Sequence, residues 1–309
     1  MIMPETDEPS FNEFVNLNKA CNQRCLFCSA EENILAQSMK EVNAVIKRAG
    51  GRLTIGGWEP TLHPRLAEIV AKAGKAGAEN ITLFTNAVLL DDPAYVRRLV
   101  SAGVNTFHVN FPSHEEGLSD FLTRSPGSFR RRLAGIRNIF GAPGRKHVSL
   151  VFVINSFNYR TMPEYAGFVA ANFPSVIHVL FTALCIMGKA EKDHSLVPRY
   201  GKIRPYLASA QAVLLRRRIK CLIENVPLCL MPGYEHASFD ARQAFASGAP
   251  AGAPGKSQHE QCGGCSLKAA CSGLRDDYFR VYGSRELKPS SRRPDDIART
   301  IKLLKAARL

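Results

Sequence analysis

Short apolar runs alternate with longer amphipathic stretches through the first two thirds of the chain. The runs are rich in branched residues and predict strands at Phe14–Leu17, Leu53–Ile55, Ile81–Phe84, Thr106–Phe111, Val148–Ile154 and Val176–Phe181. The stretches between them carry apolar residues at helical spacing and predict helices at Ala36–Ala49, Arg65–Ala76, Ala94–Ala102, Ser128–Phe140 and Tyr165–Phe173. Six such units indicate an α/β fold, in which a helix-covered parallel sheet curves into a partial (β/α)6 TIM-like barrel.

Beyond Phe181 this pattern loosens. A helix is expected at Tyr200–Arg218, followed by an apolar run at Ile219–Ile223. Residues 236–261 contain ASGAPAGAPGKSQ, a composition that predicts a mobile loop, and Asp295–Leu309 predicts a basic amphipathic helix packed on the barrel. We therefore expect a barrel at 11–190, a connecting helical segment at 191–220, a small cysteine-rich extension at 221–285 and a C-terminal helix at 286–309.

Composition places the chain among ordinary globular proteins. With 309 residues, 45% of them hydrophobic and 22% charged, it has enough apolar material for a large core. No apolar run approaches the roughly 20 residues that span a bilayer, and the acidic start MIMPETDEPS is unlike a secretion signal. We expect a cytoplasmic protein without a membrane partner, whose nine cysteines are reduced and available for metal.

The net charge of +14 is spread along the chain. Arginine runs lie at 130–132, 216–218 and 292–293, in separate predicted elements. Solvated helix faces explain such dispersed charge. Attraction of an anionic substrate, an acidic peptide or RNA is the alternative, but stacking aromatics are not interleaved with the arginines, which argues against a nucleic-acid partner.

Three cysteines follow the first predicted strand in the sequence CNQRCLFC. Cys21, Cys25 and Cys28 are separated by gaps of three and two residues. Thiolates at this spacing can bind three corners of a cubane iron-sulfur cluster and leave its fourth iron without a protein ligand. A structural zinc site would normally add a fourth Cys or His nearby, and no His follows Cys28 within the usual few residues.

Two further motifs follow the next two strands. GGWEP follows the second predicted strand, and Thr85-Asn86-Ala87 follows the third. In parallel α/β folds the loops after the strands gather at the end where ligands bind. These motifs and the three cysteines should therefore meet at one mouth of the barrel.

Together these residues resemble the radical S-adenosylmethionine (SAM) superfamily. The resemblance covers about residues 11–190 and implies an enzyme with a 4Fe-4S cluster on the three cysteines and SAM beside the open iron. Reduced flavodoxin or ferredoxin would deliver an electron. SAM would then be cleaved to methionine and a 5′-deoxyadenosyl radical, which takes a hydrogen atom from the substrate.

The resemblance also assigns residues to SAM. The implied contacts are Phe27, Gly56, Gly57, Trp58, Glu59, Pro60, Asn86, Asn155 and Ser156. Trp58 stands where relatives carry a second glycine, so either the turn is shifted by one residue or that position tolerates a side chain with negative φ. Ala87 replaces the glycine of the family's Thr-Asn-Gly. Asn86 could equally stabilise its own strand-to-helix turn.

A second group of cysteines lies in the last third of the chain. It comprises Cys229 and, within CGGCSLKAACSG, Cys262, Cys265 and Cys271. Four thiolates can hold zinc or a 4Fe-4S cluster, and spacing alone does not choose between them. The segment resembles the cysteine-rich extension of SPASM or Twitch type in some radical SAM proteins, which implies one auxiliary 4Fe-4S cluster.

The substrate is less constrained. Cys185 follows the sixth predicted strand and is a candidate hydrogen-atom donor to a substrate radical, although isolated cysteines are more often buried apolar residues. The first strand begins about ten residues from the N-terminus, so no leader-binding domain is expected. This favours a polar small molecule or sugar intermediate, in natural-product or cofactor biosynthesis, over a ribosomal peptide delivered by a separate recognition protein. RNA modification and a non-catalytic zinc-binding role are further alternatives.

Overall fold

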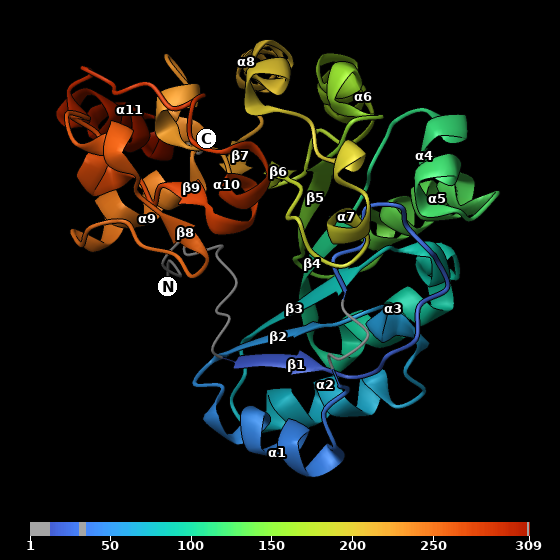
Figure 1. Ribbon diagram of the computed structural model, residues 1–309. Coiled ribbons are helices and arrows are strands. Elements are labelled where there is room, and N and C mark those ends of the chain that lie inside the picture. The colour runs from blue at the N-terminus through green and yellow to red at the C-terminus, as the bar shows by residue number, and fades with distance from the viewer. Residues whose placement is uncertain (1–12, 31–34, 308) are drawn as a thin grey trace. The chain divides into compact units, whose positions relative to one another are not determined.

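The computed structural model describes residues 13–30, 35–307 and 309 of the chain (Figure 1). Seven strands form one sheet in the order β1-β2-β3-β4-β5-β6-β7, and they span Phe14–Asn16, Arg52–Gly56, Asn80–Thr85, Val104–Asn110, His147–Ile154, His178–Ala183 and Cys221–Glu224. Strand β2 pairs in parallel with β1 and β3, as do β3 with β4 and β6 with β7. This sequential parallel order confirms the expected α/β class and is consistent with a partial TIM-like barrel.

All six predicted strands are present, and β7 is added to them. It corresponds to the apolar run Ile219–Ile223, which was not among the predicted strands. In the pairing with β6, Val179 lies beside Cys221 and Phe181 beside Ile223. The predicted extension at 221–285 therefore begins with a strand of the main sheet. Cys221 is buried there, and burial raises the pKa of its thiol to about 12.

The chain divides into two compact units, the first of which contains the described residues of Met1–Arg24, Glu32–Asn110 and Ser125–Ser149. Its helices are α1 (Met39–Arg48), α2 (Leu66–Lys75), α3 (Pro93–Ala102) and α5 (Ser128–Gly141). Side-chain caps begin two of them, because the Ser38 hydroxyl accepts from the Glu41 N–H group and the Asp92 carboxylate from the Ala94 N–H group. Helices α1 and α2 lie along one side of the first strands (Figure 1).

The first strands end at a common edge of the sheet. Asn16 of β1 lies beside Gly56 of β2, and Ile55 of β2 lies beside Leu83 of β3. The segments that follow these strands carry the first cysteine, the GGWEP turn and the Thr-Asn-Ala turn. They leave the sheet at the same edge, as the parallel arrangement predicts.

The second unit contains the described residues of Cys25–Glu31, Phe111–Arg124 and Leu150–Leu309. Its helices are α4 (Glu116–Thr123), α6 (Met162–Asn172), α7 (Lys189–Lys192), α8 (Tyr200–Arg216), α9 (Phe239–Ser247), α10 (Asp276–Tyr282) and α11 (Pro294–Ala306). Strands β8 (Lys256–Ser257) and β9 (Leu274–Arg275) form a separate antiparallel pair. Over the described residues, no helix combines the length and the apolar character needed to cross a membrane.

Two predictions for the last third of the chain are wrong. Residues 236–261 are not one continuous mobile loop, because α9 lies within them; it begins where the Ser238 hydroxyl accepts from the Ala241 N–H group, and Ala241 is buried. Among the described residues, the apolar face of the C-terminal helix packs on the cysteine-rich extension rather than on the barrel. Ile297 and Ile301 of this helix join an apolar cluster with Leu228, Ala241, Leu267 and Ala270.

Candidate metal centres and the residues around them

The first candidate centre is the loop of Cys21, Cys25 and Cys28. Cys21 belongs to the first unit, and Cys25 and Cys28 belong to the second. In the second unit the Cys28 N–H group donates to the Cys25 carbonyl at 3.3 Å, which forms a tight turn between the two thiols. Phe27 is buried inside this turn, with 4% of its surface exposed. The aromatic ring therefore anchors the segment that carries both cysteines.

The Cys21 sulfur accepts hydrogen bonds in the first unit. The Gln23 N–H group donates at 3.4 Å, and Nδ2 of Asn86 donates at 3.8 Å. Hydrogen bonds of this kind stabilise the negative charge of a metal-bound thiolate, so the surroundings of Cys21 fit an iron-sulfur ligand. Oδ1 of Asn86 accepts from the Val88 N–H group at 3.0 Å. Asn86 thus stabilises its own turn, and its contact with SAM stays a prediction.

Glu59 joins the GGWEP turn to the turn after β3. Its carboxylate is wholly buried and accepts from the Thr61 N–H group, the Thr61 and Thr85 hydroxyls and the Asn86 N–H group at 2.6 to 3.1 Å. Burial raises the pKa of Glu59, and these hydrogen bonds partly oppose the increase. Glu59 therefore holds together the two turns of the predicted SAM-binding edge.

The GGWEP turn requires glycine at one position. Gly57 has a φ of +92°, and a Cβ atom there would lie 1.9 Å from Oδ1 of Asn16. Trp58 is absent from the described non-glycine residues with positive φ, so its position tolerates a side chain. Its indole N–H is buried and finds no acceptor among the described residues. A buried donor without a partner at this edge fits the binding of a polar ligand.

We expect Glu59→Gln to lower the free energy of unfolding by about 1–3 kcal/mol. The glutamine side chain has one oxygen and one NH2 group in place of two oxygens. If its oxygen accepts from Thr61 and Thr85, its NH2 group must face the Asn86 N–H group, and two donors then oppose each other. Urea unfolding of the metal-free protein measures the change. Glu68→Gln is the control, because the Glu68 carboxylate is exposed and pairs with exposed Arg65 at 2.8 Å. An equal loss in both variants would contradict the proposed role of Glu59.

Ala87 holds a conformation that suits glycine. Its φ is +59°, and its N–H group donates to the Thr85 hydroxyl at 2.9 Å. We expect Ala87→Gly to raise the free energy of unfolding by about 0.5–1 kcal/mol, because a left-handed alanine is strained. Ala142→Gly is the control, since Ala142 has a φ of −68° and should lose stability slightly. Urea midpoints of the two variants should move in opposite directions.

Asn155 and Ser156 follow β5 and are bonded within the second unit. Asn155 is wholly buried, with Nδ2 donating to the Val153 carbonyl at 3.2 Å and Oδ1 accepting from the Phe157 N–H group at 3.0 Å. The Ser156 hydroxyl donates to the Ser195 carbonyl at 2.6 Å. Both side chains shape the loop after β5, and their contact with SAM stays a prediction.

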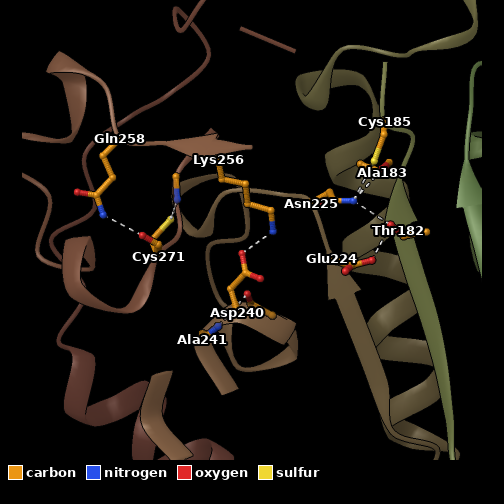
Figure 2. Close-up of polar contacts among 12 residues, drawn as sticks. Thr182, Ala183, Cys185, Glu224, Asn225, Asp240, Ala241, Lys256, Gln258 and Cys271 are labelled. Atoms are coloured by element: carbon orange, nitrogen blue, oxygen red, sulfur yellow. Dashed lines mark hydrogen bonds and ion pairs between the residues drawn. The ribbon is translucent and has the colours of Figure 1, made fainter. Parts of the chain in front are cut away.

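The second candidate centre gathers the other four predicted ligands. A hollow in the second unit is lined by Cys229, Cys262, Cys265 and Cys271, together with Pro227, Leu228, Gln258, Lys268, Gly273 and Leu287. Short turns present these thiols, and Nε2 of Gln258 donates to the Cys271 carbonyl at 2.9 Å (Figure 2). The structure therefore brings together cysteines that lie more than thirty positions apart in the sequence.

The donor set of this hollow fits a metal cluster. Burial is the main cause that raises the pKa of Cys229, to about 11, and the Cys271, Cys265 and Cys262 thiols raise it further. The Gly273 and Ser290 N–H groups donate to the Cys271 and Cys265 sulfurs. Over the described residues, no three Cys, His, Asp or Glu side chains are already arranged to hold a metal ion. The fit therefore rests on the shared hollow, the mutual repulsion of the thiolates and the N–H donors.

Cys185 lies beyond the end of β6, beside the polar side chain of Asn225 (Figure 2). Nδ2 of Asn225 lies 3.6 Å from its sulfur and also bonds the Thr182 hydroxyl and the Ala183 carbonyl. Burial raises the pKa of the Cys185 thiol, which favours the protonated form that a hydrogen-atom donor needs. Asn225 has a φ of +64° at the end of β7. Asn225 was not predicted as a site residue, because the apolar run Ile219–Ile223 before it carries no clear strand signal of its own.

Within the second unit, the loop after Cys185 is bonded to Cys28 at one end and to Asp277 at the other. The Lys189 N–H group donates to the Cys28 carbonyl at 3.2 Å, and a Cβ atom on Gly188 would lie 2.7 Å from the same oxygen. At its other end, the Ile186 N–H group donates to the Asp277 carboxylate at 2.9 Å. Asp277 is ion-paired with Arg275 in the segment that follows Cys271.

The sequence model of the Radical SAM superfamily matches residues 15–169, half of the chain. The chain belongs to the radical SAM superfamily. It is therefore an enzyme of a family that uses SAM and a 4Fe-4S cluster and needs a reductant. The matched segment includes the first three cysteines, both turns at the sheet edge and the loop after β5.

Curated relatives of this radical SAM enzyme include two proteins named probable GTP 3′,8-cyclase. The one from Thermoplasma volcanium is 31% identical over 188 residues, which cover 58% of this chain and 56% of the relative. The one from Saccharolobus solfataricus is 30% identical over 151 residues, which cover 47% and 48% of the two chains. The chain thus spans about half the length of the curated relatives it matches.

Solved structures show the same fold. Methylornithine synthase (PylB) aligns with a TM-score of 0.53 at 15% identity, covering 94% of this chain and 81% of that one. The enzyme anSMEcpe, with AdoMet and a peptide bound, aligns with a TM-score of 0.58 at 11% identity, covering 89% and 81% of the chains. At these identities the likeness supports the fold alone.

Proposed function

We propose that this enzyme binds its SAM-cleaving 4Fe-4S cluster through Cys21, Cys25 and Cys28 and an auxiliary 4Fe-4S cluster through the second cysteine group. The observation that carries the first assignment is the superfamily match over residues 15–169, which contains all three cysteines at the expected spacing. The shared hollow of the four later thiols supports the second assignment. The extension would then be of SPASM or Twitch type.

The residues of the chain would bind the cluster and SAM, orient the substrate and shield the radical from water. When bound, the cluster and SAM supply a 5′-deoxyadenosyl radical that abstracts a hydrogen atom from the substrate. Gly57 permits close backbone approach in the GGWEP turn, and the Trp58 N–H group offers a buried donor. Glu59 fixes this turn against Asn86. Cys185 is the candidate donor of a returning hydrogen atom, since burial raises the pKa of its thiol and so favours the protonated form.

The proposed substrate is a polar small molecule of cofactor or natural-product biosynthesis. The curated relatives are named as probable GTP 3′,8-cyclases and match this chain at about 30% identity, so a nucleotide is the first class to test. Reduced flavodoxin or ferredoxin is the proposed electron donor, because the family requires a reductant.

Transfer of a substrate hydrogen into 5′-deoxyadenosine tests this function. The anaerobically reconstituted enzyme is given SAM, dithionite and a substrate deuterated at its carbon-bound positions. GTP, a nucleotide sugar and a free sugar phosphate form one set, and synthetic peptides and tRNA form the control set. We expect deuterium in 5′-deoxyadenosine only with a small molecule. Transfer from peptide or tRNA alone would replace the proposed substrate class while leaving the family assignment intact.

A further inference from the structure

We propose that Asn86 raises the reduction potential of the SAM-cleaving cluster by donating a hydrogen bond to the Cys21 thiolate. Arg132 and Glu59 are the positioning residues that hold Asn86 in place for this contact. The inference rests on the proposed function, because it takes Cys21 as a cluster ligand. It concerns residues of the first unit alone.

The orientation of the Asn86 amide is fixed by its neighbours. Oδ1 accepts from the Val88 N–H group at 3.0 Å, and a backbone N–H group can only donate, so Nδ2 must be the atom that faces the other way. Nδ2 lies 2.7 Å from Oδ1 of Asn22 and 3.8 Å from the Cys21 sulfur. Its two N–H bonds can serve both acceptors.

Two buried charged side chains hold the backbone of Asn86. Its N–H group donates to Oε2 of Glu59 at 2.7 Å, and its carbonyl accepts from Nε of Arg132 at 3.0 Å. Glu59 and Arg132 are both 0% exposed. Burial of full charges is costly unless they are paired and hydrogen-bonded. The two hydrogen bonds thus fix the backbone of Asn86 in the Thr85-Asn86-Ala87 turn.

Helix α5 brings Arg132 to the turn by direct contact. A Cβ atom on Gly135 would lie 2.3 Å from the Ala87 carbonyl oxygen, so only glycine allows α5 to pack this closely. The charge-run interpretation, a solvated helix face, is therefore wrong for Arg132. It holds for Arg131, whose guanidinium is half exposed and pairs with Asp91 at 2.6 Å. Adjacent arginines on one helix thus have different roles.

The hydrogen bond from Asn86 to the Cys21 sulfur should raise the reduction potential of the cluster. Reduction adds negative charge to a cluster and its thiolates, so a donor aimed at the Cys21 sulfur stabilises the reduced form more than the oxidised form. The positive charge of Arg132 acts in the same direction. A turn that served the fold alone would leave the potential of the cluster unchanged.

Redox titration of the reconstituted full-length enzyme, followed by electron paramagnetic resonance, tests the inference. The change of its signal on adding SAM identifies the relevant cluster. We expect Asn86→Ala to disfavour reduction by up to about tenfold, which corresponds to about 59 mV for one electron. Arg132→Met should shift the potential in the same direction. Arg131→Met, which removes the same charge one residue away, should leave it unchanged.

The possible outcomes separate the two proposals. An Asn86→Ala enzyme with full iron content and an unchanged potential overturns the inference alone. Equal shifts in the Arg131 and Arg132 variants overturn the positioning role of Arg132. Should Arg132→Met fail to fold, Asn86→Asp carries the test, because it keeps the acceptor for Val88 but removes the donor and must lower the potential at least as far as Asn86→Ala. Iron content unchanged in Cys21→Ala overturns the proposed function as well.

Discussion

Replacing Cys25 with alanine should remove one cluster and nearly all SAM cleavage. Anaerobically reconstituted wild-type enzyme is expected to hold about eight irons per chain, and Cys25→Ala about four. Formation of 5′-deoxyadenosine should fall at least 100-fold, because loss of a direct ligand exceeds the usual effect of losing a residue that only supports one. Iron analysis and chromatography of the SAM products measure both effects.

Cys221→Ala is the matched control for that experiment. Cys221 is a buried strand residue that pairs beside Val179 and is assigned to neither centre. Its variant should keep the full iron content and the wild-type rate. If Cys25→Ala still forms 5′-deoxyadenosine at the rate of Cys221→Ala, the first three cysteines do not bind the SAM-cleaving cluster.

The double replacement Cys262→Ala and Cys265→Ala should remove the other half of the iron. The SAM-induced change in the electron paramagnetic resonance spectrum should persist, because the first cluster remains. Stability should fall as well, since metal binding in a small cysteine-rich segment contributes folding free energy directly. Differential scanning calorimetry should show a lower unfolding temperature for the double variant than for Cys221→Ala.

The strongest alternative to an auxiliary 4Fe-4S cluster is structural zinc, and metal analysis distinguishes the two. Four cysteines also suit structural zinc. Zinc at one equivalent in the wild-type enzyme, lost in the double variant with no change in iron, would exclude the auxiliary 4Fe-4S cluster. The same result would leave the radical SAM assignment untouched, since that rests on residues 15–169.

The six predicted strands were recognisable because each is a short apolar run followed by a stretch with apolar residues at helical spacing. The sequence pattern missed the role of β7, since the run Ile219–Ile223 is followed by no helix comparable to those after the other predicted strands. It also missed α9, because Ala, Gly, Ser and Pro nearby favour a loop. Burial of Ala241 against Leu228 and Leu267 overrides that local preference, and such a contact between distant segments cannot be read from periodicity.

The candidate site was predictable where the spacing of residues along the sequence is typical of metal binding. Cysteine spacing indicated both thiol groups, and position after a strand indicated the edge at which the turns lie. The supporting residues were not predictable. Arg132 is indistinguishable from its exposed neighbours in sequence, and Asn225 and Asp277 gain their contacts only from the folded chain.

The loop between Ile186 and Lys189 has a consequence for how the enzyme is assembled. It is bonded at one end to Asp277 and at the other to the Cys28 carbonyl. Since Gly188 has a φ of +58° and no room for a side chain, the loop can keep both attachments in few conformations. Asp277 of α10, which follows the second cysteine group in the sequence, therefore restrains the backbone of Cys28 through this loop. A local opening around Asp277 would thus also loosen the backbone of Cys28, near the beginning of the chain.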